Sequence, residues 1–321
     1  MIKKLGLLLF LPGIFLIHTA RDVVAQDFPT RAIRIVTSEA GGNFDMVART
    51  LAQGMSGPLG QSVVVDNRAG VVAVETVAKS QPDGYTILLN GTTIWLSPFM
   101  RKKVTWDPVA DFSPVTLAVS APNILVVHPS LPVKSVKDLI NLTRSRPGEL
   151  NVGTTTPGGS IHLAAELFNV MAGTDIVRVS YRGEAAALTV LMSGEIQLMF
   201  SNVSGGLPHV KSGRLRGLAV TSAQSSPLLP GVPSIAESGL PGYEFVSITA
   251  VFVPMKTPPA IVDRLNLEMI RVLHRADVKD RFFKVGVESI GSSPGQLSEK
   301  VKSEMARMGK VITKAGIKVD Y

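Results

Sequence analysis

The chain has 321 residues, of which 45% are hydrophobic, a formal net charge of +8 and no cysteine. This length is enough for two domains with a core each, and the lack of cysteine excludes disulfides, thiolate metal ligands and a cysteine nucleophile. Because the basic residues are scattered and aromatic residues are few, the charge favours acidic small molecules at most and does not indicate nucleic acid.

The first 25 residues have the pattern of an export signal. Lys3 and Lys4 precede an apolar run from Leu5 to Ile17, and small residues at 23–25 allow cleavage before Gln26. This run is too short for a membrane span, which needs roughly twenty apolar residues. We therefore expect residues 1–25 to be a signal peptide, with a retained N-terminal anchor as the alternative, and the mature protein to lie outside the cytoplasm.

Residues 33–55 predict a strand, a glycine turn and an amphipathic helix. Residues 33–37 are apolar and β-branched, and apolar residues recur from Phe44 to Met55 at helical spacing. Asn43 stands where an N-cap belongs, and Asp45 places a negative charge in the first turn. The turn leaves backbone N–H groups at a helix N-terminus, where a carboxylate or phosphate can bind. An ordinary strand–helix connection explains the glycines equally well.

The following segments repeat this alternation. We expect strands at 62–68 and 85–89, a helix at 71–80, and a polar loop at 90–93 that includes Thr92. Alternating strands and helices favour a parallel sheet with crossover helices, in which ligands bind beyond the carboxyl ends of the strands. Gly41-Gly42 and the loop at 90–93 would then lie at the same edge.

The middle of the chain repeats the opening pattern. Strands are expected at 123–128, 150–153, 176–180, 196–200 and 215–221, and helices at 135–144, 161–171 and 185–192. The polar loop from Thr154 to Ser160 precedes a helix, with Ser160 as a candidate N-cap.

The C-terminal third begins with prolines and glycines between 227 and 241, which indicate surface loops. A strand at 247–254 and helices at 260–273 and 296–314 follow. Because the chain contains neither repeats nor a flexible linker, we expect two α/β lobes that the chain enters twice, crossing near Val126 and Val251.

The sequence gives little indication of a metal site, a cofactor site or a catalytic site. The chain lacks metal-type clusters such as His-x-x-x-His, so we expect no metal and no cofactor. Residues 291–295 have the letters of a Gly-x-Ser-x-Gly elbow, but Pro294 cannot donate the N–H that its oxyanion hole requires. His162 could donate to a carboxylate or simply pack, His128 is expected to be structural, and His209 is expected in a loop.

Several motifs in order resemble the Bug family, the periplasmic receptors of tripartite tricarboxylate transporters. The motifs are Phe28-Pro29-Thr30, Gly41-Gly42 with Asp45 and Arg49, Leu59-Gly60-Gln61, Val65-Asp66-Asn67-Arg68, Pro82-Asp83-Gly84-Tyr85-Thr86, Tyr181-Arg182-Gly183 and Leu240-Pro241-Gly242-Tyr243.

The resemblance implies an α/β, type II periplasmic-binding-protein fold with two Rossmann-like lobes joined by two crossover strands. It implies lobe 1 at 26–125 and 248–321, and lobe 2 at 126–247. It also implies a monomeric periplasmic receptor, not an enzyme, that captures a small carboxylate and delivers it to membrane permease subunits. In the family, backbone groups of two facing loops hold the carboxylate, which by match are Ser38 to Asp45 and Thr154 to Ser160.

Departures from the family pattern bear on the ligand. Many members have an aromatic residue just before the glycines of the first loop, where this chain has Ser38-Glu39. Glu39 would repel a carboxylate unless it faces away, is protonated or pairs with a ligand amine. Val190 and Ser201 replace acids that many members carry, which disfavours an amino-acid ligand. Arg182 could pair with a second carboxylate or be an idle loop residue.

The candidate ligand-binding residues are Ser38, Glu39, Ala40, Gly41, Gly42, Asn43, Asp45, Thr92, Thr154, Thr155, Thr156, Gly158, Gly159, Ser160, His162, Tyr181, Arg182, Gly183, Ser201 and Asn202. Two other functions stay open. The same fold could serve as the ligand-sensing partner of a membrane sensor kinase, or carry a hydrolase or lyase with His162 and Glu39 as acid–base groups.

Overall fold

The computed structural model describes residues 28–38, 40–68, 71–155 and 157–319. The expected signal peptide at 1–25 lies outside these residues, as do Glu39 and Thr156. The strands are β1 (Ile33–Thr37), β2 (Val63–Asn67), β3 (Thr86–Gly91), β4 (Phe112–Val127), β5 (Asn151–Thr154), β6 (Val177–Ser180), β7 (Leu198–Asn202), β8 (Arg216–Val220), β9 (Val246–Pro254) and β10 (Glu288–Ser289). The helices are α2 (Asn43–Leu59), α3 (Val72–Ala78), α4 (Thr93–Met100), α5 (Val136–Ser145), α6 (Ser160–Ala172), α7 (Glu184–Ser193), α8 (Val203–Lys211), α9 (Pro259–Leu273), α10 (Ala276–Lys284) and α11 (Pro294–Lys314).

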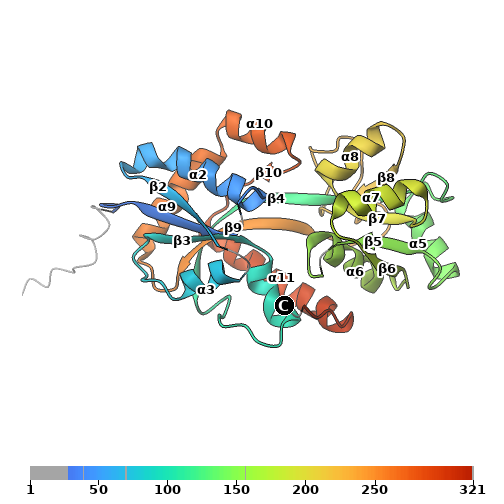
Figure 1. Cartoon of the computed structure of the whole chain (residues 1–321), viewed down its shortest axis with the longest axis horizontal. Coiled ribbons are helices and arrows are strands. Elements are labelled where there is room, and N and C mark those ends of the chain that lie inside the picture. The colour runs from blue at the N-terminus through green and yellow to red at the C-terminus, as the bar shows by residue number, and fades with distance from the viewer. Residues whose placement is uncertain (1–27, 39, 69–70, 156, 320–321) are drawn as a thin grey trace, which may run out of the picture.

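The strands form one mixed sheet in the order β2-β1-β3-β9-β4-β7-β5-β6, with β8 and β10 also paired to β4. β1 pairs in parallel with β2 and β3, and β5 pairs in parallel with β6 and β7. The parallel pairing predicted from the alternation of strands and helices is therefore confirmed. Figure 1 shows these two parallel groups at opposite ends of the molecule, each surrounded by its own helices.

Two long antiparallel strands, β4 and β9, connect the two ends (Figure 1). The first part of β4, up to Pro122, pairs with β9, whereas residues 123–127 pair with β7 and β8. The register of the β4–β9 pair shifts twice, between Pro114 and Thr116 and between Leu117 and Val119. Pro114 cannot donate a ladder hydrogen bond, so an irregularity is expected at the first of these two shifts. The lobe limits at 26–125, 126–247 and 248–321 stay a prediction.

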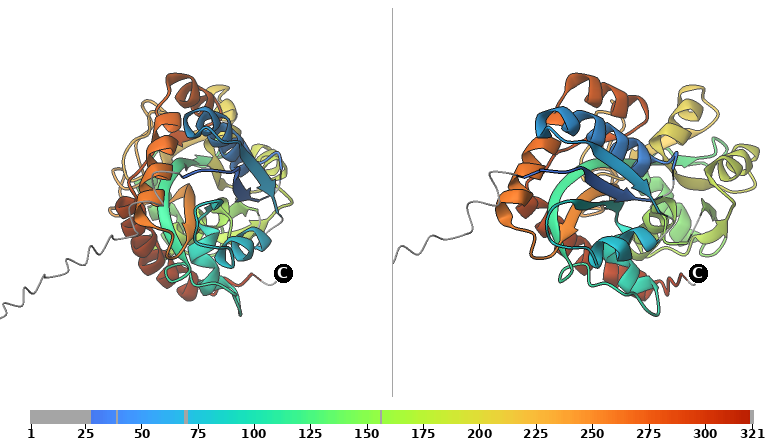
Figure 2. Two further views of the ribbon diagram at one scale, coloured as in Figure 1. Left: turned by 90° about the vertical axis from the view of Figure 1, so that its left-hand side faces the viewer. Right: turned by 60° about the vertical axis from the view of Figure 1, so that its left-hand side comes forward.

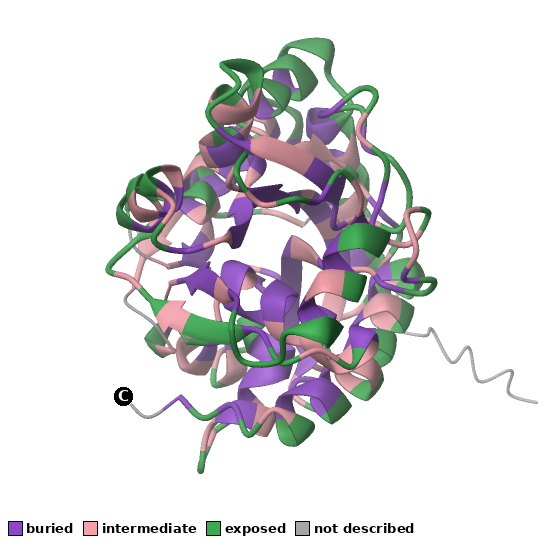
Figure 3. Ribbon diagram, turned by 90° about the vertical axis from the view of Figure 1, so that its right-hand side faces the viewer, coloured by how far each residue is buried: buried purple, intermediate pink, exposed green. Residues whose placement is uncertain are grey.

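The cores lie on both faces of the sheet. Helices α2 and α9 cover one face of the β1–β3–β9–β4 region, where Leu51, Met55 and Leu265 are fully buried. Helices α3, α4 and α11 lie against the opposite face (Figure 2). The core on that side continues into the second lobe, because α11 contacts both α4 and α6. Figure 3 shows helices of both lobes turning buried sides inward and exposed sides outward.

Several elements depart from the sequence predictions. Helices α4, α8 and α10, strand β10 and the first half of β4 were not predicted. The α4 segment is mostly apolar and contains Pro98, while α8 contains two glycines and Pro208, residues that disfavour a helix interior. His209 consequently lies in α8 rather than in the expected loop.

Two other details are corrected. Asn43 and Ser160 are the first residues of their helices and not the N-caps; extended glycines, Gly42 and Gly159, hold the cap positions without a side-chain bond. The segment 227–241 lacks helices and strands, as expected, but it is not confined to the surface, because Leu228, Leu229, Ile235 and Leu240 are buried. In the described part of the chain, no helix is both long and apolar enough to cross a bilayer.

The buried Tyr243 allows the contribution of one hydrogen bond to the stability of the second lobe to be tested. Its hydroxyl donates a hydrogen bond of 2.8 Å to the carbonyl oxygen of Ala164 in α6. We expect Tyr243→Phe to lower the free energy of unfolding by about 1 kcal/mol, the usual net value of one hydrogen bond. Tyr181→Phe is the control, because that half-buried hydroxyl has no hydrogen bond to any described residue. Urea unfolding measures both, and equal unfolding midpoints for the two variants would contradict the assignment.

Candidate ligand-binding site

The first candidate loop, residues 38–42, is fastened by the carboxylate of Asp45 in α2. Asp45 Oδ2 accepts the N–H of Gly41 at 3.0 Å and the Nε–H of Arg49 at 2.9 Å. The side-chain amide of Asn67 donates to Asp45 Oδ1 at 2.9 Å and to the carbonyl of Ser38 at 2.8 Å. The loop is therefore bound at both ends by buried or half-buried groups of its own lobe.

These contacts also set the ionisation of Asp45. The hydrogen bond from Arg49 and the N–H of Gly41 stabilise the carboxylate and outweigh the cost of its burial, so the pKa of Asp45 falls to about 2. Asp45 is therefore ionised at neutral pH, but its charge faces Arg49 and a backbone N–H. It was predicted as a ligand-binding residue, and the structure places it in contact with the loop itself.

The second candidate loop, residues 154–159, is fastened by His162 in α6. His162 Nδ1 accepts the N–H of Gly158 at 2.9 Å. Nε2 lies 3.3 Å from Glu166 Oε1, to which Arg178 also donates at 2.9 Å. Burial raises the pKa of Glu166, but the hydrogen bond from His162 and the charge of Arg178 lower it further than burial raises it.

The two loops share one geometry. In each, the third residue of the helix accepts the N–H of a glycine four residues earlier, Gly41 in the first loop and Gly158 in the second. Both glycines have positive φ, +84° and +77°, a conformation that residues with a Cβ rarely adopt. The sequence analysis identified both loops but not this bond.

Each helix start also leaves N–H groups without an acceptor in its own helix. The first helical bonds run from Met46 N to Gly42 O in α2 and from Leu163 N to Gly159 O in α6. The amides of residues 43–45 and 160–162 therefore have no partner within the helix, and the positive end of the helix dipole lies at the same place.

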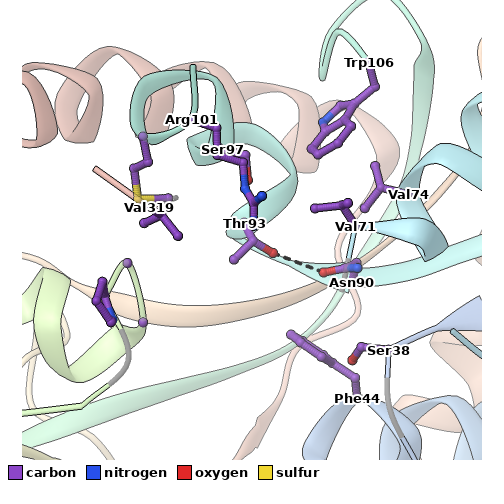
Figure 4. Close-up of a pocket in the computed structure, with 14 residues that line it drawn as sticks. Ser38, Phe44, Val71, Val74, Asn90, Thr93, Ser97, Arg101, Trp106 and Val319 are labelled. Carbon is purple, nitrogen blue, oxygen red and sulfur yellow. Dashed lines mark hydrogen bonds between the residues drawn. The ribbon is translucent and has the colours of Figure 1, made fainter. Parts of the chain in front are cut away.

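A cavity of about 460 Å³ lies between the two loops. Ser38 and Phe44 line it from the first loop and α2, and residues 157–159 line it from the second loop. Figure 4 shows Ser38 and Phe44 on one side of the cavity, and Trp106, Val71, Val74, Val319 and residues of α4 around the rest. Its volume is in the usual range of small-molecule sites.

Helix α4 forms a rigid wall of this cavity. Pro98 has no N–H to donate to the carbonyl of Ile94, and the indole Nε1–H of Trp106 donates to that oxygen instead, at 2.9 Å. The carbonyl of Met100 accepts the N–H of Val319 at 3.1 Å, which holds the C-terminal segment against the same wall. Asn90 Oδ1 accepts from the N–H of Gly91 and the hydroxyl of Thr93 (Figure 4).

The structure brings some candidate residues to the cavity and leaves others away from it. Ser38, Gly158 and Gly159 line it, and Ala40, Gly41, Gly42, Asn43, Thr155 and Ser160 belong to the two loops beside it. Thr92 immediately precedes Thr93, which lines the cavity, while Thr154 is buried at the end of β5.

The loop at 181–183 does not line the cavity, and Arg182 and Gly183 in it are exposed. Ser201 and Asn202 do not line it either. Both donate to the carboxylate of Glu184, at 2.6 Å from the hydroxyl of Ser201 and 2.6 Å from the backbone N–H of Asn202.

Four further lining residues lie in segments that the sequence analysis named without choosing these positions: Phe44, Pro157, Asn90 and Thr93. The sequence analysis did not connect the other lining residues with the site. They are Val71, Val74, Ser97, Met100, Arg101, Trp106 and Val319. The contribution of α4 and of the C-terminal segment carries no local signal, because it depends on how distant elements pack.

Acid–base chemistry finds little support in this geometry. Both ring nitrogens of the buried His162 are occupied by Gly158, Glu166 and Arg178, and His162 does not line the cavity. Within the described ranges, no group of three or more His, Cys, Asp or Glu residues is arranged to hold a metal ion.

Comparison with known proteins identifies the family. Residues 47–317 match the profile of the tripartite tricarboxylate transporter family receptor. The chain belongs to this family. It is 33% identical to the Protein BugT of Bordetella pertussis, over 97% of this chain and 98% of that one. The expected membership of the Bug family is therefore confirmed, and the chain is a solute receptor rather than an enzyme.

Solved structures agree with this receptor assignment. Rpa4515 of R. palustris, described with adipate, is 39% identical with a TM-score of 0.73 and covers 91% of this chain and 99% of its own. MatC of Rhodopseudomonas palustris, described with bound malate, is 28% identical with a TM-score of 0.68 over 89% of this chain and all of its own. The expected two-lobed periplasmic-binding-protein fold is confirmed.

The low pKa of Asp45 predicts an acid-dependent stability. The folded pKa of about 2 lies below the value of about 3.9 in an unfolded chain, so the stabilisation is present above pH 4 and is lost as the pH falls through 2. Because Arg49 is largely exposed, we expect Asp45→Asn to cost about 1 to 2 kcal/mol at pH 7. Urea unfolding between pH 2 and pH 7 should show the difference from wild type shrinking toward acid. A difference that is constant with pH would contradict this prediction.

Proposed function

We propose that this receptor captures a small carboxylate between its two lobes, in the periplasm, and delivers it to the permease subunits of a tripartite tricarboxylate-type transporter. The observation that carries the proposal is the cavity between the starts of α2 and α6, one helix from each lobe. The ligand would be held by residues of 38–45 and 154–160, and the protein would act as a monomer with lobes at 26–125, 126–247 and 248–321.

The amides at the starts of α2 and α6 are the groups suited to hold a carboxylate. A carboxylate is an anion with two acceptor oxygens, and a helix N-terminus offers both N–H donors and a favourable dipole. A hydrogen bond to a charged group contributes about 1.5 to 3 kcal/mol net. Two such bonds at each helix start, from opposite lobes, would favour the arrangement in which both lobes contact the ligand.

The hydrogen bonds that hold the two loops in place also support a carboxylate ligand. Asp45 and His162 each occupy one loop N–H, so the loops are fixed before a ligand arrives and less ordering entropy is lost on binding. The pairing of Asp45 with Arg49 keeps its charge from repelling an anion. The relatives Rpa4515 and MatC, which are described with adipate and malate, are in line with a carboxylate ligand.

A thermal-shift screen tests the proposal. The chain from Gln26 onward would be measured with mono-, di- and tricarboxylates, aromatic acids and amino acids. A ligand at a hundred times its Kd adds about 2.7 kcal/mol of stability, which raises the melting temperature clearly. A folded protein that binds none of these acids, and that mass spectrometry after denaturation shows to carry none, would refute the proposal.

The position of Gly159 gives a mutational test. Its φ of −74° is one that any residue adopts, and the residue lines the cavity next to the start of α6. We expect Gly159→Leu to fill the anion position and weaken carboxylate binding at least a hundredfold, because loss of two bonds of about 1.5 kcal/mol each has this effect. The melting temperature without ligand should change by only a few degrees.

Gly295→Leu is the matched control, because Gly295 is exposed and a Cβ there meets nothing within 4 Å. Isothermal titration with the best acid from the screen measures both variants. Retained binding in Gly159→Leu would place the carboxylate elsewhere.

A further inference from the structure

A second hollow lies on the outer surface, between the ends of α4 and α11. This groove has a volume of about 610 Å³, and its lining includes Phe99, Met305, Ala306, Lys310, Thr313 and Lys314. Phe99 lies directly against α11, because a Cβ on Gly309 would be 2.7 Å from Cε1 of its ring. The half-buried Phe99 and Met305 give the groove an apolar floor. Of the described residues that line it, none is acidic.

The charges beside this floor are positive and unpaired. Lys310 and Lys314 are exposed, and their side chains form no hydrogen bond or ion pair with any described residue. Glu304 precedes them in α11, but it is buried and already faces two bases, Lys300 at 3.3 Å and Arg307 at 2.6 Å. Its charge is therefore balanced within the protein, and the two lysines of the groove keep theirs for a partner.

The fold brings further lysines to the same end of α4. The N–H of Val319 donates to the carbonyl of Met100 at 3.1 Å, so the exposed Lys318 lies at the end of α4. Lys102 and Lys103 follow that helix and are exposed as well. The basic residues are scattered along the sequence, but packing of α4 against α11 gathers these lysines around one groove.

A surface of this kind fits an acidic peptide segment that carries an apolar side chain. Carboxylates of the segment would meet lysines, and such complementary charges speed and orient association. The apolar floor would hold an aromatic or aliphatic side chain, the type of residue that anchors most interfaces. A flat lipid surface could match the lysines but would leave the groove unfilled, so the shape favours a protein partner.

The groove and the ligand cavity share helix α4. Thr93, Ser97 and Met100 line the cavity, whereas Phe99 lines the groove. Helix α11, the other wall of the groove, also contacts α6 of the second lobe. A partner in the groove would therefore contact both helices behind the cavity wall without entering the cavity.

We propose that this groove docks an acidic segment, with an apolar anchor residue, of the membrane partner that takes the ligand from the receptor. This rests on the proposed function. The lysines attract and orient the segment, and Phe99 and Met305 hold its apolar side chain. Because Lys310 and Lys314 do not line the ligand cavity, docking and ligand capture can be changed separately.

Charge reversal tests the docking. Lys310→Glu/Lys314→Glu is compared with wild type in cells of the source organism that lack their own copy of the receptor, with the best acid from the thermal-shift screen. We expect the initial rate of uptake to fall at least tenfold, because the reversed charges repel the acidic segment. The Kd for the acid, measured by isothermal titration, should stay within twofold of wild type.

Lys279→Glu/Lys284→Glu is the matched control. It makes the same change of charge at two exposed lysines of α10, which lies on the other side of the first lobe from α11 (Figures 1 and 2). Uptake and affinity should both stay at the wild-type level. Melting curves of the two double variants without ligand show whether each is folded.

A single cysteine identifies the occupant of the groove. Since the chain has no cysteine, Thr313→Cys can carry a photoactivatable crosslinker at one exposed position of the lining. In cells that take up the acid, we expect mass spectrometry to find an adduct with an acidic segment of a permease subunit. Lys279→Cys, labelled in the same way, should give no such adduct.

The possible results differ in what they refute. Wild-type uptake with folded Lys310→Glu/Lys314→Glu refutes docking at this groove, while ligand capture stands. An adduct of Thr313→Cys with lipid, or with a second copy of this chain, refutes an acidic partner segment as the occupant. A folded wild-type chain that binds no acid refutes the proposed function, a result that titration alone reveals.

Discussion

The candidate site depends on one hydrogen bond that occurs once in each lobe. A backbone N–H of a glycine with positive φ donates to the side chain of the third residue of the next helix, from Gly41 to Asp45 and from Gly158 to His162. The bond fixes the loop against the helix start, so the unpaired helical amides keep one orientation. An acid and an imidazole perform the same task, because both present an acceptor at the distance of one helical turn.

The two side chains differ in how they are kept as acceptors. Asp45 is held ionised by Arg49 and by the N–H groups around it. His162 is buried, its Nδ1 accepts the N–H of Gly158, and its Nε2 lies 3.3 Å from the carboxylate of Glu166. The side chains that hold the two loops in place already have partners, so the backbone amides at the helix starts and the cavity wall are the groups that we expect a ligand to contact.

The rest of the cavity is supplied by elements that lie far apart in the sequence. Helix α4 follows β3, whereas Val319 comes from the end of the chain, yet they join through the bond from Val319 N to Met100 O. The Trp106 indole donates to the carbonyl of Ile94, which Pro98 leaves without its helical partner. Because α11 packs against both α4 and α6, the C-terminal helix connects this wall to the second lobe.

The class of fold and the two loops could be predicted from the amino-acid sequence. Periodicity and turn residues predicted the parallel strands and the helices α2, α6, α9 and α11, and the motifs from Phe28 to Tyr243 predicted the family. These patterns are local, because a strand, a glycine turn or a helix start can each be recognised from about ten consecutive residues. Helix α4 could not be predicted this way, because it is buried on nearly all sides and carries Pro98.

Which residues meet at the cavity became known only from the three-dimensional arrangement of the chain. It brought Arg101, Trp106 and Val319 to the loop at Gly158 and left Arg182, Ser201 and Asn202 away from it. It also assigned His162 to fastening the loop rather than to the cavity. The physical reason is that spacing in the sequence fixes which face of an element a side chain occupies, whereas its partners depend on how the faces of distant elements pack together.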